Sequence, residues 1–236
     1  MKRHLSIWML MARSTICKVL GLLLALAAAD GVLFALTLRQ DTSILGLEQV
    51  LTESHLSIVF GVCMVLLMAV LCLNGCEFSA KQGYTLRRLR VSQRELFLWQ
   101  AVHNAVCCFW LLAVQTLIVL ALCRVYAAQD PDMVNSQTVF LAFYRVPFLH
   151  SLLPLADGWR YARNAVLCAA LGVCAAAFPV QQRQGNRGFA AVILTALTVL
   201  FFVQPVRSGD FWLIGALVVI TAVALLNVTE VLHETA

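Results

Sequence analysis

Few side chains inside the apolar parts of the sequence could take part in chemistry. Asp30 and Gln115 lie deep within two separate apolar stretches, and His103 and Asn104 lie closer to the start of the second stretch. An ionisable side chain at membrane depth is costly, and it faces other helices or a water-filled path. Asp30 and Gln115 are therefore candidates for polar points on a translocation pathway. Hydration near the outer surface, or a partner on another helix, is the alternative for Asp30, and Gln115 is expected to bond a neighbouring helix.

The familiar motifs of catalysis are absent from the sequence. It contains no phosphate-binding loop, dinucleotide fingerprint, His-Glu-x-x-His pattern or Gly-x-Ser-x-Gly elbow. The nine cysteines lie within or at the ends of apolar segments, where cysteine behaves as a small hydrophobe. We therefore expect neither a metal site nor an enzyme. An intramembrane active site built from Asp30, His103 and Asn104 is the alternative.

Residues 76–100 form the only long polar run between two strongly apolar segments. Cations outnumber acids in it, which by the positive-inside rule indicates a cytoplasmic loop. Residues 79–89 also place apolar side chains among these cations, as a short helix that contacts a partner would. A solvated loop that only sets topology is the alternative. The cations are Lys81, Arg87, Arg88, Arg90 and Arg94, the acids are Glu77 and Glu95, and the apolar positions are Tyr84, Leu86 and Leu89.

A capping box predicts where the next helix begins. Ser92 and Glu95 have the Ser-x-x-Glu spacing, in which the hydroxyl accepts from the backbone N–H three residues on and the carboxylate reaches back. The sequence therefore predicts a helix that starts at about Gln93 and continues into the membrane.

Composition indicates an integral membrane protein with an all-α fold. The chain has 236 residues, of which 61% are hydrophobic and only 12% charged, whereas a soluble domain is about a quarter charged. At about 20 residues a span, there is room for about six transmembrane helices in a single domain. The net charge of +5 is a topology signal and no indication of nucleic-acid binding. The expected spans are residues 19–38, 56–73, 96–122, 165–180, 189–206 and 211–232.

The remaining segments are expected at the two membrane surfaces. Residues 1–18 predict an amphipathic helix in the inner interface, and a signal peptide cleaved near residue 29 is the rival interpretation. Residues 39–55 are an acidic outer loop. Residues 127–164 are too interrupted to span and predict an outer interfacial insertion. This arrangement puts both termini in the cytoplasm. The aromatic belt of the insertion is expected to comprise Phe140, Phe143, Tyr144 and Trp159.

Residues 83–100, GYTLRRLRVSQRELFLWQ, resemble the loop between the second and third helices of type-2 ABC exporter permeases. In that family a small residue and Thr-Leu precede a basic and apolar turn, and Val-Ser-x-x-Glu-Leu begins the third helix. The chain departs from the family in placing its long outer insertion between the third and fourth spans. The matching positions are Gly83, Thr85, Leu86, Val91, Ser92, Glu95 and Leu96.

The resemblance implies a permease subunit in the plasma membrane of a bacterium. The coupling loop over residues 76–95 would form the coupling helix, whose residues 77–94 dock on a separate nucleotide-binding subunit, and that ATPase would bind ATP and Mg²⁺. The permease would act as a homodimer or heterodimer, as an exporter of an unspecified substrate. The implied docking residues are Glu77, Lys81, Tyr84, Leu86, Arg87, Leu89, Arg90 and Arg94.

Two other functions stay open at this point. A membrane scaffold or immunity-type binding protein would use the apolar residues 139–155 to bind a peptide or partner. A secondary transporter would use Asp30 as a proton site, although no inverted repeat is visible.

Overall fold

The computed structural model describes residues 2–40, 46–75, 92–129, 136–155, 158–183, 188–203 and 209–234. The described residues are almost all helical and contain no strand, which confirms the predicted all-α class. The helices are α1 (Lys2–Gln40), α2 (Leu47–Glu53), α3 (Leu56–Gly75), α5 (Gln93–Gln129), α6 (Ser136–Arg145), α7 (Pro147–Leu152), α8 (Gly158–Arg183), α9 (Phe189–Val203) and α10 (Gly209–Glu234).

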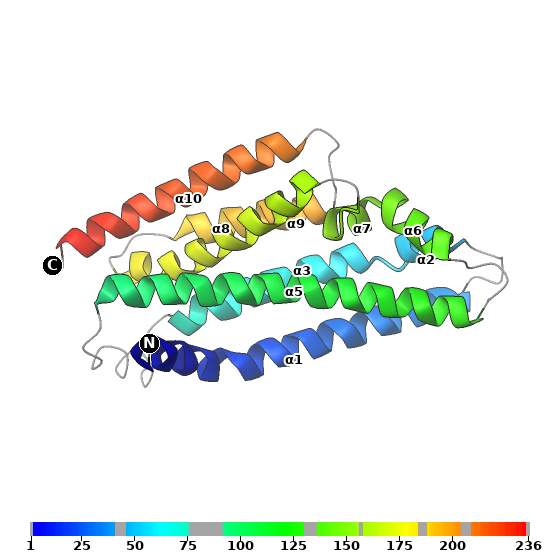
Figure 1. Cartoon of the computed structure of the whole chain (residues 1–236), viewed down its shortest axis with the longest axis horizontal. Coiled ribbons are helices and arrows are strands. Elements are labelled where there is room, and N and C mark those ends of the chain that lie inside the picture. The colour runs from blue at the N-terminus through cyan, green and yellow to red at the C-terminus, as the bar shows by residue number, and fades with distance from the viewer. Residues whose placement is uncertain are drawn as a thin grey trace.

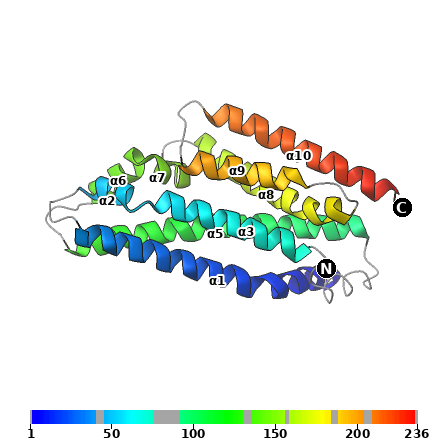
Figure 2. The same ribbon diagram turned by 180° about the vertical axis from the view of Figure 1, so that it is seen from behind.

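The long helices lie side by side along one axis (Figures 1 and 2). Successive long helices run in opposite directions, so α1 and α5 are parallel, and α3 packs on α1 in the opposite sense. We call the end that holds the start of α1 and the end of α10 the termini end, and the end that holds α2, α6 and α7 the cap end. The last turn of α3 and the first turn of α5 both lie at the termini end.

Four helices are long and apolar enough to cross a membrane. Helices α9 and α10 contain shorter apolar stretches, Phe189–Val203 and Ile214–Val223, against the roughly 20 residues that a perpendicular span requires. The described residues therefore support a membrane protein with four candidate spans. These are Met11–Arg39, Leu56–Asn74, Gln93–Ala128 and Gly158–Gln182.

The surface segments differ in detail from the expectation. Helix α1 is continuous from Lys2 to Gln40, so the expected interfacial helix over residues 1–18 and the first span are one helix. No proline interrupts it, and glycine inside a helix is tolerated. The expected outer loop over residues 39–55 contains α2, which buries Leu47, Val50 and Leu51.

The expected insertion over residues 127–164 consists, where described, of the end of α5, helices α6 and α7, and the start of α8. Phe140, Tyr144 and Trp159 are more than half exposed, as an interfacial aromatic belt requires. Phe143 is only 2% exposed and therefore belongs to the core, which corrects the prediction for this residue. The reason is helical geometry, because Phe143 and Ala142 occupy the face of α6 that turns toward the bundle.

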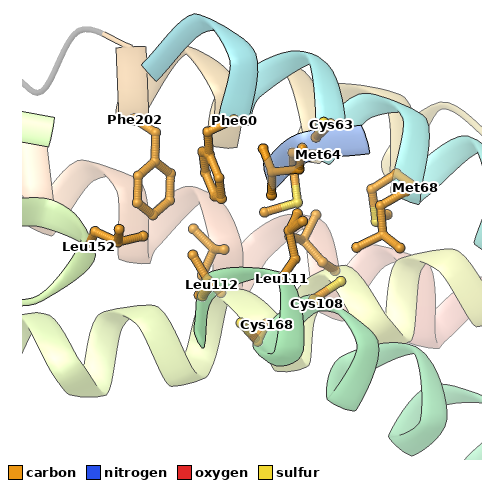
Figure 3. Close-up of a cluster of buried hydrophobic side chains, with 14 of the residues drawn as sticks. Phe60, Cys63, Met64, Met68, Cys108, Leu111, Leu112, Leu152, Cys168 and Phe202 are labelled. Atoms are coloured by element: carbon orange, nitrogen blue, oxygen red, sulfur yellow. The ribbon is translucent and has the colours of Figure 1, made fainter. Parts of the chain in front are cut away.

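Apolar side chains of α3, α5, α7, α8 and α9 meet in one part of the core (Figure 3). Phe60 of α3 contacts Phe148 of α7 and Phe202 of α9, with ring centroids 5.7 and 5.1 Å apart. Met64 and Leu111 extend this cluster toward α5. Helix α8 completes it with small residues and is the most buried of the four candidate spans.

Gly172 allows the backbones of α5 and α8 to approach closely. A methyl group added there would lie 2.6 Å from the backbone nitrogen of Ala105 and 2.7 Å from the backbone oxygen of Ala101. Neither backbone atom can turn aside as a side chain can. Small residues at helix contacts are the usual means of close packing in membranes.

We therefore expect Gly172→Ala to lower the free energy of unfolding by about 1–3 kcal/mol, the usual range for overpacking. Unfolding in mixed detergent micelles measures this change. The matched control is Gly21→Ala, because an added methyl group there meets nothing within 4 Å and only improves helix propensity. Equal stability of the two variants would contradict the close approach of α5 and α8.

Candidate functional site

The structure brings Asp30 of α1 and Gln115 of α5 together. Gln115 Nε2 donates a hydrogen bond of 2.8 Å to Asp30 Oδ2, and both residues are 0% exposed. The other oxygens of the two groups, Asp30 Oδ1 and Gln115 Oε1, are buried without a hydrogen-bond partner. Asp30 thus has a partner on another helix, which was one of the alternatives considered, and Gln115 bonds a neighbouring helix.

Two further contacts join α1 and α5 nearer the termini end. Thr15 Oγ1 lies 2.8 Å from His103 Nε2, and the rings of Trp8 and Trp99 lie 5.8 Å apart. The Cys107 thiol lies 3.7 Å from His103 Nε2 on the same helix. The seam between these parallel helices is therefore held at three levels along its length.

The end of α3 is tied to α1 by an amide. Asn74 Nδ2 donates to Ser14 Oγ at 2.9 Å, and Lys18 Nζ donates to Asn74 Oδ1 at 3.2 Å. Asn74 precedes Gly75, the last residue of α3. The end of α3 and the start of α5 are therefore both connected to α1 at the termini end. Residues 76–91 join these two helix ends in the sequence.

Helix α5 begins at Gln93, the position that the capping box predicts. The Glu95 backbone N–H donates to Ser92 Oγ at 3.3 Å, which forms one half of that box. Arg94 is exposed in the first turn. The other expected docking residues, Glu77, Lys81, Tyr84, Leu86, Arg87, Leu89 and Arg90, lie outside the described residues.

A buried arginine at the cap end was not among the expected site residues. Arg163 of α8 is 1% exposed. Its Nη2 donates to the Ser151 carbonyl oxygen at 3.1 Å and to Asn164 Oδ1 at 2.9 Å, and its guanidinium carbon lies 4.5 Å from the centre of the Phe201 ring. Asn164 Nδ2 also donates to the Ser151 carbonyl, at 2.9 Å. This cluster connects α7, α8 and α9.

The sequence contains only a weak signal for this cluster. Arg163 and Asn164 stand immediately before the small-residue run that was expected to be the fourth span. Arg163 falls within the expected outer insertion over residues 127–164, because the next span is expected to begin at residue 165. Helix α8 begins at Gly158, so both side chains lie within the helix and can turn toward α7.

An ion pair links the short helices of the cap end. Arg145 Nη1 of α6 lies 3.3 Å from Glu48 Oε1 of α2. The side chains of Arg145 and Glu48 are 63% and 36% exposed, so this ion pair adds at most about 1 kcal/mol to the stability of the fold. The pair serves to position α2 and α6 beside each other.

The described part of the chain offers no metal centre. No group of three or more His, Cys, Asp or Glu side chains is placed there to hold an ion. The cysteines within it are free, and all but Cys17 are buried. The candidate site is thus a set of polar contacts between helices.

Comparison with models of protein families, with curated proteins and with solved structures found no match. No relative therefore supplies a function for these residues. The chemistry of the site has to follow from the contacts described above.

We expect Arg163→Lys to lower the free energy of unfolding by about 1.5–3 kcal/mol, the range for hydrogen bonds to charged groups. Lysine keeps the charge but cannot form the planar fork that reaches Ser151 and Asn164 together. Unfolding in mixed micelles measures the loss. The control is Arg124→Lys at an exposed position of α5, for which a change within about 0.5 kcal/mol is expected. A loss that is equally small at Arg163 would mean that the cluster does not hold α7 on α8.

Proposed function

We propose that the chain is the transmembrane permease subunit of an ABC transporter and acts as an exporter. ATP hydrolysis would take place in a separate nucleotide-binding subunit, and a second permease chain would complete the pathway as a homodimer or heterodimer. The proposal includes six crossings of a bacterial plasma membrane, with α9 and α10 as the fifth and sixth, and both termini in the cytoplasm.

The observation that carries the proposal is the connection among α1, α3 and α5 at the termini end. A permease has no energy source of its own, so force from an ATPase must enter through a cytoplasmic segment and reach several helices. Residues 76–91 join α3 to α5, and Asn74 ties the end of α3 to Ser14 and Lys18 of α1. A push on this segment would therefore move all three helices as one group.

The start of α5 supports the same mechanism. The cap from Ser92 to Glu95 fixes the first turn of α5 next to the basic segment, and Trp99, less than two turns further on, packs against Trp8 of α1. A capped helix frays less than an uncapped one, so movement of the segment is passed to the helix. Because residues 83–100 resemble a coupling helix, we propose an ABC ATPase as the partner of this segment.

The secondary transporter is favoured by one observation, the burial of Asp30 with one carboxylate oxygen unpartnered. Intramembrane carboxylates often carry protons in transporters. The two functions differ in their dependence on ATP. An Asp30→Asn variant with intact, ATP-dependent transport would exclude Asp30 as the coupling site.

Co-purification tests the coupling segment. We expect a subunit with a Walker motif and ATPase activity to co-purify with the wild-type chain from its own cells. A variant with Leu86, Leu89 and Arg90 all changed to glutamate should retain at most about a tenth of the co-purified ATPase subunit. This corresponds to a loss of about 1.4 kcal/mol or more in binding free energy. Arg124→Glu, exposed near the cap end of α5, is the matched charge control and should retain the partner. Unchanged co-purification with the triple variant would remove the coupling role.

Reporter fusions test the proposed topology. An enzyme active only in the cytoplasm should be active when fused to either terminus, because the start of α1 and the end of α10 lie at the same end of the bundle. A reporter active only outside should be active when inserted between α1 and α2. Opposite results at the two termini would rule out six crossings.

A further inference from the structure

The hydrogen bonding between Asp30 and Gln115 is incomplete on both side chains. Gln115 Nε2 donates to Asp30 Oδ2 at 2.8 Å, while Asp30 Oδ1 and Gln115 Oε1 have no partner. Both orphaned atoms are acceptors when Asp30 is ionised, and both residues are 0% exposed. Such groups cost several kcal/mol each in an apolar interior, and an ionised carboxylate costs more.

Among the described residues that pack around α1, none supplies a cation to Asp30. Helix α1 packs against α2, α3 and α5. From α3, the buried Cys63 thiol lies within electrostatic range of the carboxyl group, and Gln115 is its partner from α5. On α2, Glu48 is paired with Arg145 and Glu53 accepts from Gln49.

The buried histidine of the α1–α5 seam is too distant to compensate the charge of an ionised Asp30. His103 lies 12 residues before Gln115, which is about 18 Å along the helix, and it contacts Thr15. Among the described residues, no Lys, Arg or His side chain forms an ion pair with Asp30. An ionised Asp30 would therefore be a buried charge with a single hydrogen bond.

We propose that Asp30 binds a proton on Oδ1 and forms a cyclic acid–amide pair with Gln115. The carboxyl O–H donates to Gln115 Oε1, while Gln115 Nε2 donates to Asp30 Oδ2. One proton thereby satisfies both orphaned oxygens and removes the buried charge. The ring closes by rotation about the terminal torsions of the two side chains, and these torsions are soft.

A proton fits this site better than a metal cation does. Hard cations such as Ca²⁺ take six or more oxygen ligands. Asp30 Oδ1 and Gln115 Oε1 are two, and the described residues contain no metal-binding group of three acidic, His or Cys side chains. A proton needs one donor oxygen and one acceptor oxygen, which is what the pair offers.

The bound proton makes the pair a latch between α1 and α5. The protonated pair is neutral and has two hydrogen bonds, so it holds the helices in register. Removal of the proton leaves two facing acceptors and a buried charge, which weakens the same contact. This inference does not rest on the proposed transport function, because any membrane protein with this pair would have the same latch.

Infrared difference spectroscopy of the purified, reconstituted chain tests the protonation state. The wild type minus Asp30→Asn spectrum at neutral pH should contain the C=O stretching band of a protonated carboxylic acid. Gln115→Leu should keep this band and move it to higher wavenumber, because the acid loses its hydrogen-bond partner. Glu53→Gln on α2, a control at an exposed carboxylate, should leave the band unchanged.

Thermal unfolding of the same samples tests the pairing. Asp30→Asn should melt close to the wild type, because asparagine forms the same ring of two hydrogen bonds with Gln115. Asp30→Ala should melt at a distinctly lower temperature, because it leaves the buried amide unpaired. The proposal would be overturned if the carboxylic acid band were absent, or if the unfolding midpoint rose with Na⁺ in the wild type only. A higher unfolding midpoint for Asp30→Asn than for the wild type would overturn it as well.

Discussion

The few polar contacts between helices determine how this bundle is assembled, because most of its helix surface is apolar. Leu24 of α1 and Leu117 of α5 are 71% and 64% exposed, on the same helices that bury Asp30 and Gln115 completely. In lipid, a leucine is equally well placed inside or outside the bundle, so apolar burial does not select the inward face. An unpaired polar group is costly in either place. The Asp30–Gln115 and Thr15–His103 contacts therefore fix the rotation and register of α1 on α5.

The contacts of α8 follow a different rule. Its run of Ala, Gly and Cys presents little side-chain volume, and Gly172 brings its backbone against Ala101 and Ala105 of α5. Dispersion over such a close contact substitutes for polar pairs along this face. Polar contacts of α8 are found near the cap end, where Arg163 and Asn164 meet the Ser151 carbonyl. Helices α1, α3 and α5 are thus located by polar partners, and α8 by both polar partners and close backbone approach.

Local signals in the sequence predicted much of the helical plan. The Ser92–Glu95 spacing placed the start of α5 at Gln93, where the structure has it, because a cap is a contact between residues three apart. The depth of Asp30 and Gln115 was also evident, because each stands alone in an apolar run. Their contact was not evident, since 85 positions separate them and only the register of α1 on α5 brings them together.

Features that depend on tertiary contacts could not be predicted from the sequence. Phe143 was expected in an aromatic belt, yet the rotation of α6 that buries it depends on how α6 sits on the bundle. Arg163 falls within the expected outer insertion, where a charged residue at the edge of a span is usually hydrated. Its burial needs a carbonyl from α7 and a ring from α9, and neither partner is a neighbour in the chain.

The placement of polar contacts also bears on how such a bundle could move. Those at the termini end join α1, α3 and α5, and those around Arg163 join α7, α8 and α9. The core between the two sets is lined by apolar side chains such as Phe60, Met64 and Leu111 (Figure 3). Displacement of apolar surfaces against each other breaks no hydrogen bond, whereas a break within either set exposes a buried polar group at a cost of about 1–3 kcal/mol. Movement driven from the termini end would therefore displace each set largely as a unit, with the change in packing concentrated in the apolar core.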